Sequence, residues 1–298
     1  MFLKRKPHAR LVNGLDFAMF TFPALAVVLI TTNIPFVMSI YYSLFDWNGL
    51  SRSMTFVGID NFIRIFTIDA QFMKAIQFTI RFAAFYIVIV NILAVIIALP
   101  LSKSGLVSQI GRSCFYIPNI ISLIAVSLVW RFLFGPGFDA LADLTGLEIF
   151  KWSWLGTSTL AFYSVLILTV WQSVGFYMII YVAGIIGVPQ DIVEAAEIDG
   201  SRGIGHFFRI TLPLIMPSVT VCIFTSLIGA LKLFDVVLAF TKGGPGGSTA
   251  TVAWNIYQEA FSKYRFGVAT AKSVVFFAAV LVITVIQLTF FKKREVEI

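Results

Sequence analysis

Six long apolar segments constrain the fold of this 298-residue chain more than any other feature of its sequence. They cover approximately residues 17–41, 76–101, 113–134, 160–186, 212–240 and 268–291. Each reaches the ~20 residues that an α-helix needs to cross a bilayer. Only 12% of the residues are charged and 59% are hydrophobic, whereas about 25% of residues are charged in soluble domains. An isolated apolar segment satisfies its backbone in lipid only as a helix. The sequence therefore predicts an all-α polytopic membrane protein with six transmembrane helices.

The distribution of basic residues predicts the orientation of these spans. An even number of spans places both termini on the same side. If that side is the cytoplasm, the inner segments hold 11 Lys and Arg in 59 residues and the outer loops hold seven in 86. The clusters Lys4-Arg5-Lys6 and Lys292-Lys293-Arg294 border spans, where the positive-inside rule is strongest. We therefore expect cytoplasmic termini, and Phe17–Tyr41 is too long to be a cleaved signal peptide.

Several functional classes are disfavoured by the composition. The net charge of +7 is explained by basic residues beside spans, so we expect no nucleic-acid partner. The two histidines, His8 and His206, and the two cysteines, Cys114 and Cys222, are scattered, and we expect the cysteines to be buried packing residues. No G-x-x-x-x-G-K-[ST] string occurs, so the chain has no P-loop of its own. We predict no catalytic residue, no metal and no cofactor bound by this chain.

A compact charged segment separates the fourth and fifth spans. Pro189 is suited to a helix start, Asp191 places negative charge in its first turn, and Gly200 is suited to the left-handed C′ position. Ser201 is expected to cap a second helix that continues into the fifth span. Residues 191–209 carry a net charge of −2 from four acidic and two basic residues, whereas a lipid-surface helix is rich in Lys and Arg. A protein partner is therefore favoured over lipid.

The same segment resembles the EAA signature of permease subunits of ATP-binding-cassette importers. That signature reads E-A-A, three residues, G, nine residues and I-x-L-P. It is matched at every spacing by Glu194, Ala195, Ala196, Gly200, Ile210, Leu212 and Pro213. The stretches "PFVMSIYYSLFDW" (35–47), "FVGIDNFIRIF" (56–66) and "FDVVLAFTKGGPGGST" (234–249) resemble the carbohydrate branch of that family. This branch includes maltose, oligosaccharide and glycerol phosphate permeases.

The resemblance implies most of what we expect of the function. It implies the type I (MetI-like) permease fold, one membrane domain over 1–298, and a coupling-helix segment at 187–213 that docks on a cytoplasmic ATPase. Asp199 joins the seven matched residues as a coupling candidate. The implied partners are a second permease, more often different than identical, two ATPase subunits that carry ATP and Mg²⁺, and an extracytoplasmic solute-binding protein. The chain would import a carbohydrate across the bacterial cytoplasmic membrane by alternating access, without being an enzyme.

The alternative is a secondary transporter that is driven by an ion gradient and needs no ATPase. Such a protein is expected to have inverted repeats and ionisable groups within its spans. Neither is apparent in this sequence.

Candidate pathway residues lie within the spans and at their ends. Asn91 and Gln172 fall near the middle of the second and fourth spans, where an amide either links helices or contacts the solute. Aromatic candidates for contact with a sugar are Trp130, Trp171 and Tyr177. On a continuous helix Lys232 and Asp235 share a face, ~28 Å from Pro213 for Lys232. These two and Arg131 either snorkel to the interface or ring an outer mouth that favours an anionic solute.

Overall fold

The computed structural model describes residues 19–292 of the chain. Within this range, five helices are long and apolar enough to cross a membrane, and a bent pair of helices makes a sixth candidate. The five are Met19–Tyr42, Ala70–Leu101, Leu123–Thr145, Ser158–Ile186 and Phe266–Phe290, and the bent pair is Gly203–Leu214 with Met216–Leu231. The all-α fold and the six spans are therefore confirmed when the bent pair is taken as one span.

The structure divides into two compact units. One comprises the chain up to Ile65 together with Glu259–Val275, and the other comprises Phe66–Gln258 together with the chain from Phe276 onward. The basic cluster Lys4-Arg5-Lys6 and the pair Lys293-Arg294, which support the predicted orientation, lie outside the described residues.

The first unit contains the N-terminal span and a small hairpin. Its elements are η1 (Leu29–Asn33), α2 (Ile34–Tyr42), β1 (Phe45–Asp46), β2 (Thr55–Phe56), α3 (Asp60–Thr67, up to Ile65), η6 (Gln258–Ser262, from Glu259) and the start of α14 (Phe266–Lys292). The two strands pair antiparallel, with Phe45 opposite Phe56. Buried Asn61 donates hydrogen bonds of 2.9 Å to the carbonyls of Ser43 and Phe45. A Cβ atom at Gly267 would overlap the carbonyl oxygen of Phe45, so only glycine permits this approach.

The first unit contains a buried charge cluster around Glu259. The side chains of Glu259 and Lys272 are both 0% exposed, and Lys272 Nζ lies 2.7 Å from Glu259 Oε2. Lys263 Nζ lies 3.3 Å from the same oxygen, and Arg265 contacts Glu259 Oε1. Lys272 falls within the predicted span 268–291. Glu259 and Lys272 are 13 positions apart, whereas side chains on one helix contact each other at spacings of three or four.

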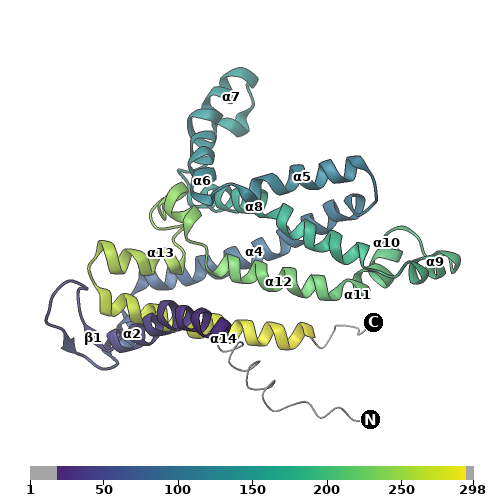
Figure 1. Cartoon of the computed structure of the whole chain (residues 1–298). Coiled ribbons are helices and arrows are strands. Elements are labelled where there is room, and N and C mark those ends of the chain that lie inside the picture. The colour runs from purple at the N-terminus through teal and green to yellow at the C-terminus, as the bar shows by residue number, and fades with distance from the viewer. Residues whose placement is uncertain (1–18, 293–298) are drawn as a thin grey trace, which may run out of the picture. The chain divides into compact units, whose positions relative to one another are not determined.

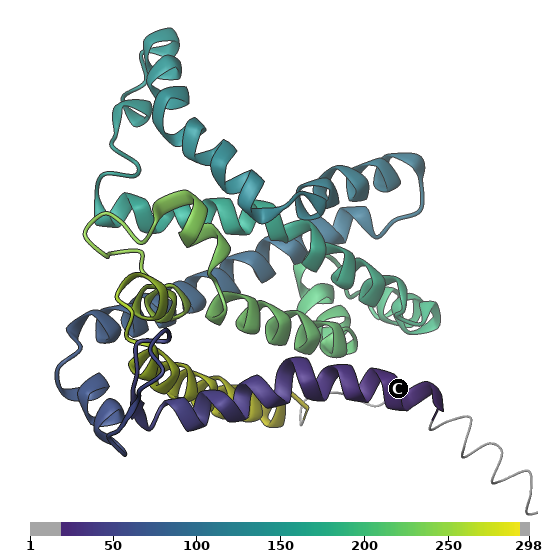
Figure 2. The same ribbon diagram turned by 60° about the vertical axis from the view of Figure 1, so that its left-hand side comes forward.

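The second unit is built around three helices that pack side by side (Figures 1 and 2). These are α4 (Ala70–Leu101), α8 (Ser158–Ile186) and α12 (Met216–Leu231). Side-chain caps start the first two: Asp69 accepts from the N–H of Phe72 at 2.9 Å, and Thr157 from that of Leu160 at 3.4 Å. Both caps satisfy a backbone donor that a helix start leaves free.

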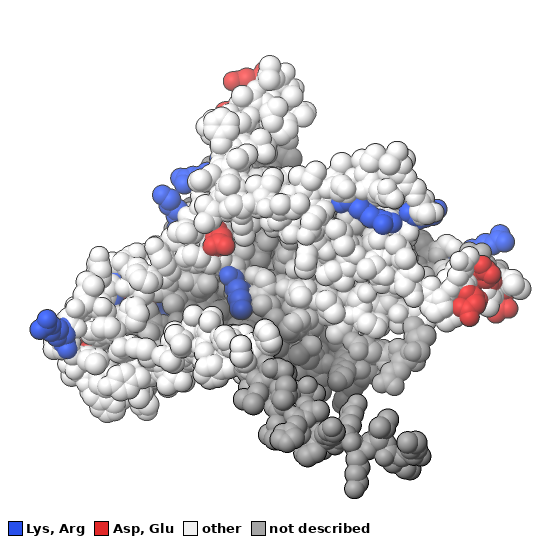
Figure 3. Space-filling view, in the orientation of Figure 1, with Lys and Arg blue, Asp and Glu red and all other residues white. Residues whose placement is uncertain are grey.

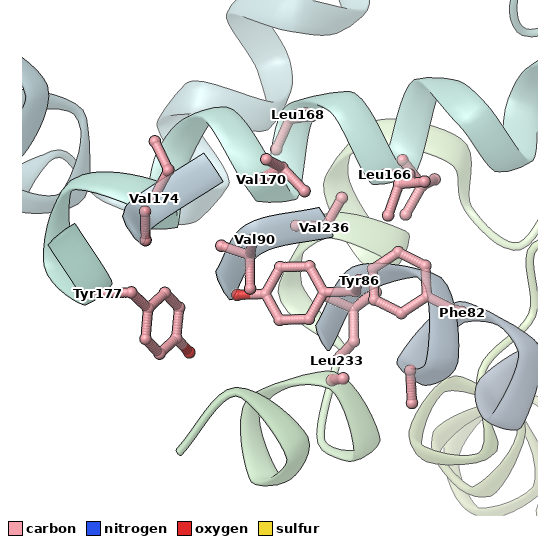
Figure 4. Close-up of a cluster of buried hydrophobic side chains, with 14 of the residues drawn as sticks. Phe82, Tyr86, Val90, Leu166, Leu168, Val170, Val174, Tyr177, Leu233 and Val236 are labelled. Atoms are coloured by element: carbon pink, nitrogen blue, oxygen red, sulfur yellow. The ribbon is translucent and has the colours of Figure 1, made fainter. Parts of the chain in front are cut away.

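The core of the second unit lies between α4 and α8. Figure 4 shows Phe82, Tyr86 and Val90 of α4 facing Leu166, Val170 and Val174 of α8. The rings of Phe82 and Tyr86 stack at 5.6 Å between centroids. The hydroxyl of Tyr86 lies 2.8 Å from Ser173 Oγ, so the buried phenol is satisfied across the helix pair. This core is mainly apolar, with hydroxyls paired between helices.

The predicted third span, 113–134, begins at a different residue in the structure. The segment forms two helices, α5 (Leu106–Ile120) and α6 (Leu123–Phe132), which are separated by extended backbone at Ile121 and Ser122. Pro118 removes a backbone donor from the last turn of α5, which weakens continuation of that helix. The candidate span is instead Leu123–Thr145, in which α6, η2 (Leu133–Gly137) and α7 (Phe138–Thr145) follow one another with a kink at Gly135.

Helix α5 lies against α8 through a close backbone contact. A Cβ atom built at Gly175 of α8 would overlap the carbonyl group of Phe115 in α5. Glycine at this position therefore allows the two helices to approach, and any side chain would force them apart.

The predicted fifth span, 212–240, is not a straight helix. The axis bends by 78° between Gly203–Leu214 and α12. The bend lies at Ile215, between Pro213 in α11 (Leu212–Leu214) and Pro217 in the first turn of α12. Proline is tolerated at a helix start but interrupts a helix interior. Helix α12 then ends at Leu231, and the chain turns before η5 (Val237–Thr241).

The remaining elements of the second unit are short. They are η3 (Glu148–Lys151), α9 (Gln190–Ile198), α10 (Gly203–His206), η4 (Phe207–Thr211) and α13 (Val252–Tyr257). The start of α13 is attached to α4, because the N–H of Val252 donates to Thr79 Oγ1 at 3.0 Å. This contact joins residues that are 173 positions apart in the sequence.

Candidate functional site

The segment that carries the EAA signature folds as a helix, a glycine turn and a second helix. Helix α9 begins at Gln190, immediately after Pro189. It ends in a Schellman arrangement, in which Gly200 has φ of 82° and the N–H of Ser201 donates to Ala196 O at 2.9 Å. These features confirm the predicted helix start and the role of Gly200 as its C′ residue.

The second helix of this segment begins later than predicted. Its N-cap is Arg202, which forms no side-chain cap, and α10 starts at Gly203. The proposed cap at Ser201 is therefore wrong, because that residue takes the C″ position of the Schellman turn. From Gly203 the chain runs through η4 and α11 to the bend at Ile215.

The surface of the segment is acidic and apolar together. Figure 3 shows the carboxylates gathered at the α9 end of the second unit; they include Asp191, Glu194 and Asp199, all of which are exposed. Large apolar side chains are also exposed here: Ile198 is 86% exposed, Ile204 78% and Phe208 61%. An exposed apolar group with a charged rim is typical of a protein docking surface. We call Ile198, Ile204 and Phe208 the docking residues.

The other predicted coupling residues have different environments. Glu194 Oε1 accepts a 2.8 Å hydrogen bond from Gln190 Nε2. Ala195 is exposed and Ala196 is buried, so only one of the two alanines faces outward. Ile210, Leu212 and Pro213 are half-buried. These three connect the docking residues to the bend rather than extend the docking surface.

Asn91 forms an interhelical network at the centre of the second unit. Its Oδ1 accepts from the hydroxyl of Tyr181 at 2.7 Å, and its Nδ2 donates to Ile87 O at 2.8 Å and to Ser226 Oγ at 3.1 Å. The amide therefore joins α4, α8 and α12. The sequence left open whether this amide links helices or contacts the solute. The link between helices accounts for both donors and one acceptor position of the side chain.

Of the remaining polar and aromatic candidates, two lie together. The rings of Trp130 and Trp171 are 5.3 Å apart between centroids, and Trp171 is 41% exposed. Gln172 Nε2 donates to Asn119 O at 3.4 Å, which links α8 to α5. Tyr177 is buried and only 5% exposed. The structure therefore supports one aromatic pair, in which Trp171 is exposed and Trp130 is half-buried, and does not bring all five pathway candidates to one cavity.

The three charged pathway candidates do not form the predicted arrangement. Lys232 lies in the turn after α12 and Asp235 follows in the next helical segment, so the prediction that they share one helical face is wrong. The estimate of ~28 Å from Pro213 fails for the same reason, because the axis bends at Ile215. Arg131, Lys232 and Asp235 are exposed. Within the described residues, none of the three forms an ion pair with another.

An apolar groove that the sequence did not indicate lies beside the coupling segment. It encloses about 840 Å³ and is lined by α4, Tyr181 and the chain from Gly203 to Ile223. His206 lines it, and its Nδ1 atom is buried without a hydrogen-bond partner in the described structure. Asn91 lies at the groove wall. The groove therefore connects the surroundings of the amide network with the second helix of the coupling segment.

The two cysteines differ in their exposure. Cys222 is buried, as predicted, but Cys114 is exposed on α5, so the prediction that it is a buried packing residue is wrong. Within residues 19–292, no group of three or more His, Cys, Asp or Glu side chains is arranged to hold a metal ion.

Comparison with known proteins places the chain in a family. Residues 90–295 match the family described as binding-protein-dependent transport system inner membrane component. AmyD of Thermoanaerobacterium thermosulfurigenes, a probable starch degradation products transport system permease, is 38% identical over 285 residues, which is 96% of this chain and 97% of that protein. MsmF of Streptococcus mutans, a multiple sugar-binding transport system permease, is 33% identical and covers 88% of this chain and 90% of its own.

Solved structures agree in fold. A chain of a bacterial transporter that imports the acidic polysaccharide alginate has a TM-score of 0.78 at 19% identity, and covers 95% of this chain and 99% of its own. A second structure of a bacterial alginate transporter, in complex with its pentasaccharide-bound periplasmic protein, has a TM-score of 0.78 at 22% identity, over 95% and 96%. The type I permease fold inferred from the signature is confirmed by this likeness. A transport component of this kind agrees with the prediction that the chain is not itself an enzyme. The chain belongs to the binding-protein-dependent transport system inner membrane component family, as an ABC importer permease.

Proposed function

We propose that the chain is the permease of an ATP-driven importer whose solute is a carbohydrate. The observation that carries this proposal is the coupling segment, in which exposed apolar and acidic side chains on α9 and α10 precede a helix that bends into the membrane-spanning core. AmyD and MsmF are named for the transport of starch degradation products and of multiple sugars, which supports a carbohydrate as solute. ATP and Mg²⁺ are bound by a separate ATPase and not by this chain.

The proposed mechanism begins at the docking residues. An ATPase groove encloses Ile198, Ile204 and Phe208, and basic residues at its rim pair with Glu194 and Asp199. Movement of the ATPase displaces this seated segment as a rigid body. Displacement reaches α12 through the bend, and then α4 and α8 through the Asn91 network. Two arrangements of these helices expose the pathway alternately to the two sides of the membrane.

The remaining assembly follows the same proposal. Both termini lie in the cytoplasm, as the basic residues beside the spans indicate, and the solute-binding protein docks on the opposite face. Two ATPase subunits bind inside. A second permease, different in sequence from this one, completes the pathway. Support for a second permease is the helix Met19–Tyr42, of which no residue in its apolar window is buried within this chain.

Replacing a docking residue tests the coupling. Ile198→Asp places a charge where the ATPase groove would enclose an apolar group, and Ile198 makes little contact within the chain because it is 86% exposed. A central interface residue contributes about 2 kcal/mol or more, so we expect at least a tenfold weaker association with the ATPase and a matching loss of ATP-dependent uptake. The readouts are co-purification of the ATPase and uptake into proteoliposomes.

Ile68→Asp is the matched control, because Ile68 is 73% exposed, lies outside the candidate spans and precedes the start of α4, at the end that the proposed orientation places outside the cytoplasm. Normal ATPase association in Ile198→Asp would contradict the docking role. Carbohydrate uptake by the chain without any ATPase, driven by an ion gradient, would favour a secondary transporter instead.

A further inference from the structure

A second cavity, different in character from the apolar groove, lies at the other end of α4. It encloses about 440 Å³, a size within the range of small-molecule sites. Its walls are the first turns of α4, the first turn of α8 and the glycine-rich loop that follows η5; the residues with charged or hydrogen-bonding side chains are Lys74, Gln77, Arg81, Ser158, Thr159 and Ser248. We call this cavity the polar pocket.

The glycine-rich wall of the polar pocket has a defined shape. Gly243, Gly246 and Gly247 have φ of 81°, 58° and 82°, a region that other residues rarely adopt. Thr249 holds the loop together, since its hydroxyl donates to Gly244 O at 2.7 Å and its N–H to Gly243 O at 3.2 Å. A Cβ atom at Gly243 would overlap the indole of Trp254. The loop is therefore packed against α13, and its turn at Gly246 and Gly247 faces the pocket.

Donors dominate the lining of the polar pocket. Lys74 and Arg81 are two turns apart on α4, and no Asp or Glu lines the cavity. Neither cation forms an ion pair within the described part of the chain. The N–H groups of Ser158 and Thr159 belong to the first turn of α8, where backbone donors have no intrahelical acceptor. Ser248 Oγ is buried and has no hydrogen-bond partner in the described structure. This lining is suited to an anion.

Aromatic faces complete the lining. Phe78 and Phe162 both contact the cavity, and their rings are 5.8 Å apart between centroids. The guanidinium carbon of Arg81 lies 4.5 Å from the centroid of the Phe162 ring, which holds this cation at the wall. Aromatic faces beside hydroxyl and amide groups are typical of a sugar site. The combination with two cations indicates a sugar that carries a negative charge.

The position of the polar pocket makes it accessible to solute. A helix of 32 residues such as α4 is about 48 Å long, which exceeds the ~30 Å hydrocarbon core. The polar residues Gln71, Lys74 and Gln77 lie in its first turns, so this end projects beyond the core. In the orientation proposed above, this is the extracytoplasmic end.

We propose that the polar pocket binds the carboxylate-bearing residue of an acidic carbohydrate as it enters the permease. This inference rests on the proposed function and names its substrate class. Lys74 and Arg81 flank the carboxylate, the Ser248 hydroxyl and the first-turn N–H groups of α8 donate to it, and the ring of the sugar lies against Phe162. The charged candidates Lys232 and Arg131 are not part of this pocket.

The test uses the complete transporter complex in nanodiscs of phosphatidylcholine, with glucuronate and glucose as the probes. Saturation-transfer NMR measures the affinity of each probe. We expect glucuronate to bind at least tenfold more tightly than glucose. We expect the double variant Lys74→Gln, Arg81→Gln to remove that difference. Lys151→Gln is the matched control, because it removes an exposed cation whose partner is Glu148 and which does not line the pocket.

Equal binding of the two sugars, or unchanged glucuronate binding in the double variant, would overturn the inference. Two further arms identify other ligands of the same chemistry. Loss of glucuronate binding when phosphatidylglycerol replaces part of the lipid would assign the pocket to a headgroup. If the double variant bound the solute-binding protein more weakly but bound glucuronate unchanged, the pocket would be assigned to protein docking. Both results would overturn the inference. Co-purification of the ATPase with the unmodified chain and with Ile198→Asp, measured in parallel, tests the proposed function separately.

Discussion

Removal of the Glu259 carboxylate tests whether the buried charge cluster holds the first unit together. Glu259 and Lys272 are 0% exposed and 2.7 Å apart, so their direct attraction is about 6 kcal/mol at an effective dielectric constant of 20. Much of this offsets the cost of taking both charges out of water. Glu259→Gln removes the attraction and leaves Lys272 buried and charged. We therefore expect a loss of about 3–5 kcal/mol of local stability.

The other two cations contribute less to this loss. The side chains of Lys263 and Arg265 are 36% and 44% exposed, so solvent screens them once the carboxylate is gone. The double variant Glu259→Gln, Lys272→Met removes both buried charges. Because replacing a buried pair by neutral groups is often close to neutral, this variant should recover most of the lost stability.

Hydrogen exchange of the amides in Gly267–Lys272 measures the effect where it occurs. A change of 1.36 kcal/mol is tenfold in an equilibrium constant, so exchange through local opening should be about two to four orders of magnitude faster in Glu259→Gln. Glu148→Gln is the control, since Glu148 pairs with Lys151 at 2.8 Å but is 76% exposed. Solvent screens such an exposed pair, so Glu148→Gln should change the exchange rate little. The reasoning would be refuted if Glu259→Gln and Glu148→Gln changed the exchange rate equally. It would also be refuted if the double variant exchanged faster than Glu259→Gln.

Three further substitutions test contacts of the second unit, with thermal unfolding followed by maleimide labelling of buried Cys222 in a Cys114→Ser background. Gly175→Ala places a methyl group against the backbone of α5 and should cost about 1–3 kcal/mol; an unchanged midpoint would contradict the close contact. Tyr181→Phe leaves the buried Oδ1 of Asn91 without its donor and should cost about 1–3 kcal/mol, with uptake per folded complex unchanged; altered solute preference would instead support a pathway role for this network. Thr79→Val removes the acceptor of the Val252 N–H and should cost a similar amount of stability; an unchanged unfolding midpoint would contradict this contact.

The sequence predicted features that depend on local chemistry. The C′ role of Gly200 and the helix start after Pro189 follow from residue type and position alone. The apolar segments predicted the number of spans when the bent pair is taken as one. Their lengths also predicted most ends within a few residues, because burial in lipid requires a continuous apolar helix.

Features that depend on packing between distant segments were not predicted. Apolar composition continues across Ile121 and Ile215, so it could not locate the break before α6 or the 78° bend before α12. The prolines near both positions were the available signal, but a proline in a span is compatible with a kink or a straight helix. Lys272 pairs with Glu259 only in the folded chain. The polar pocket likewise combines residues from positions 74 to 248.

The bend at Ile215 gives the coupling segment the geometry of a bell crank. The two arms, Gly203–Leu214 and Met216–Leu231, contain 12 and 16 residues and are therefore about 18 and 24 Å long. The helix axis bends by 78° at Ile215, which is 1% exposed and therefore contacts neighbouring residues on all sides. A rotation of about 10° would move the far end of the longer arm by about 4 Å, nearly at right angles to the force on the shorter one. In the proposed mechanism, a sideways thrust on the shorter arm at the membrane surface would thus become a stroke of the longer arm within the bilayer.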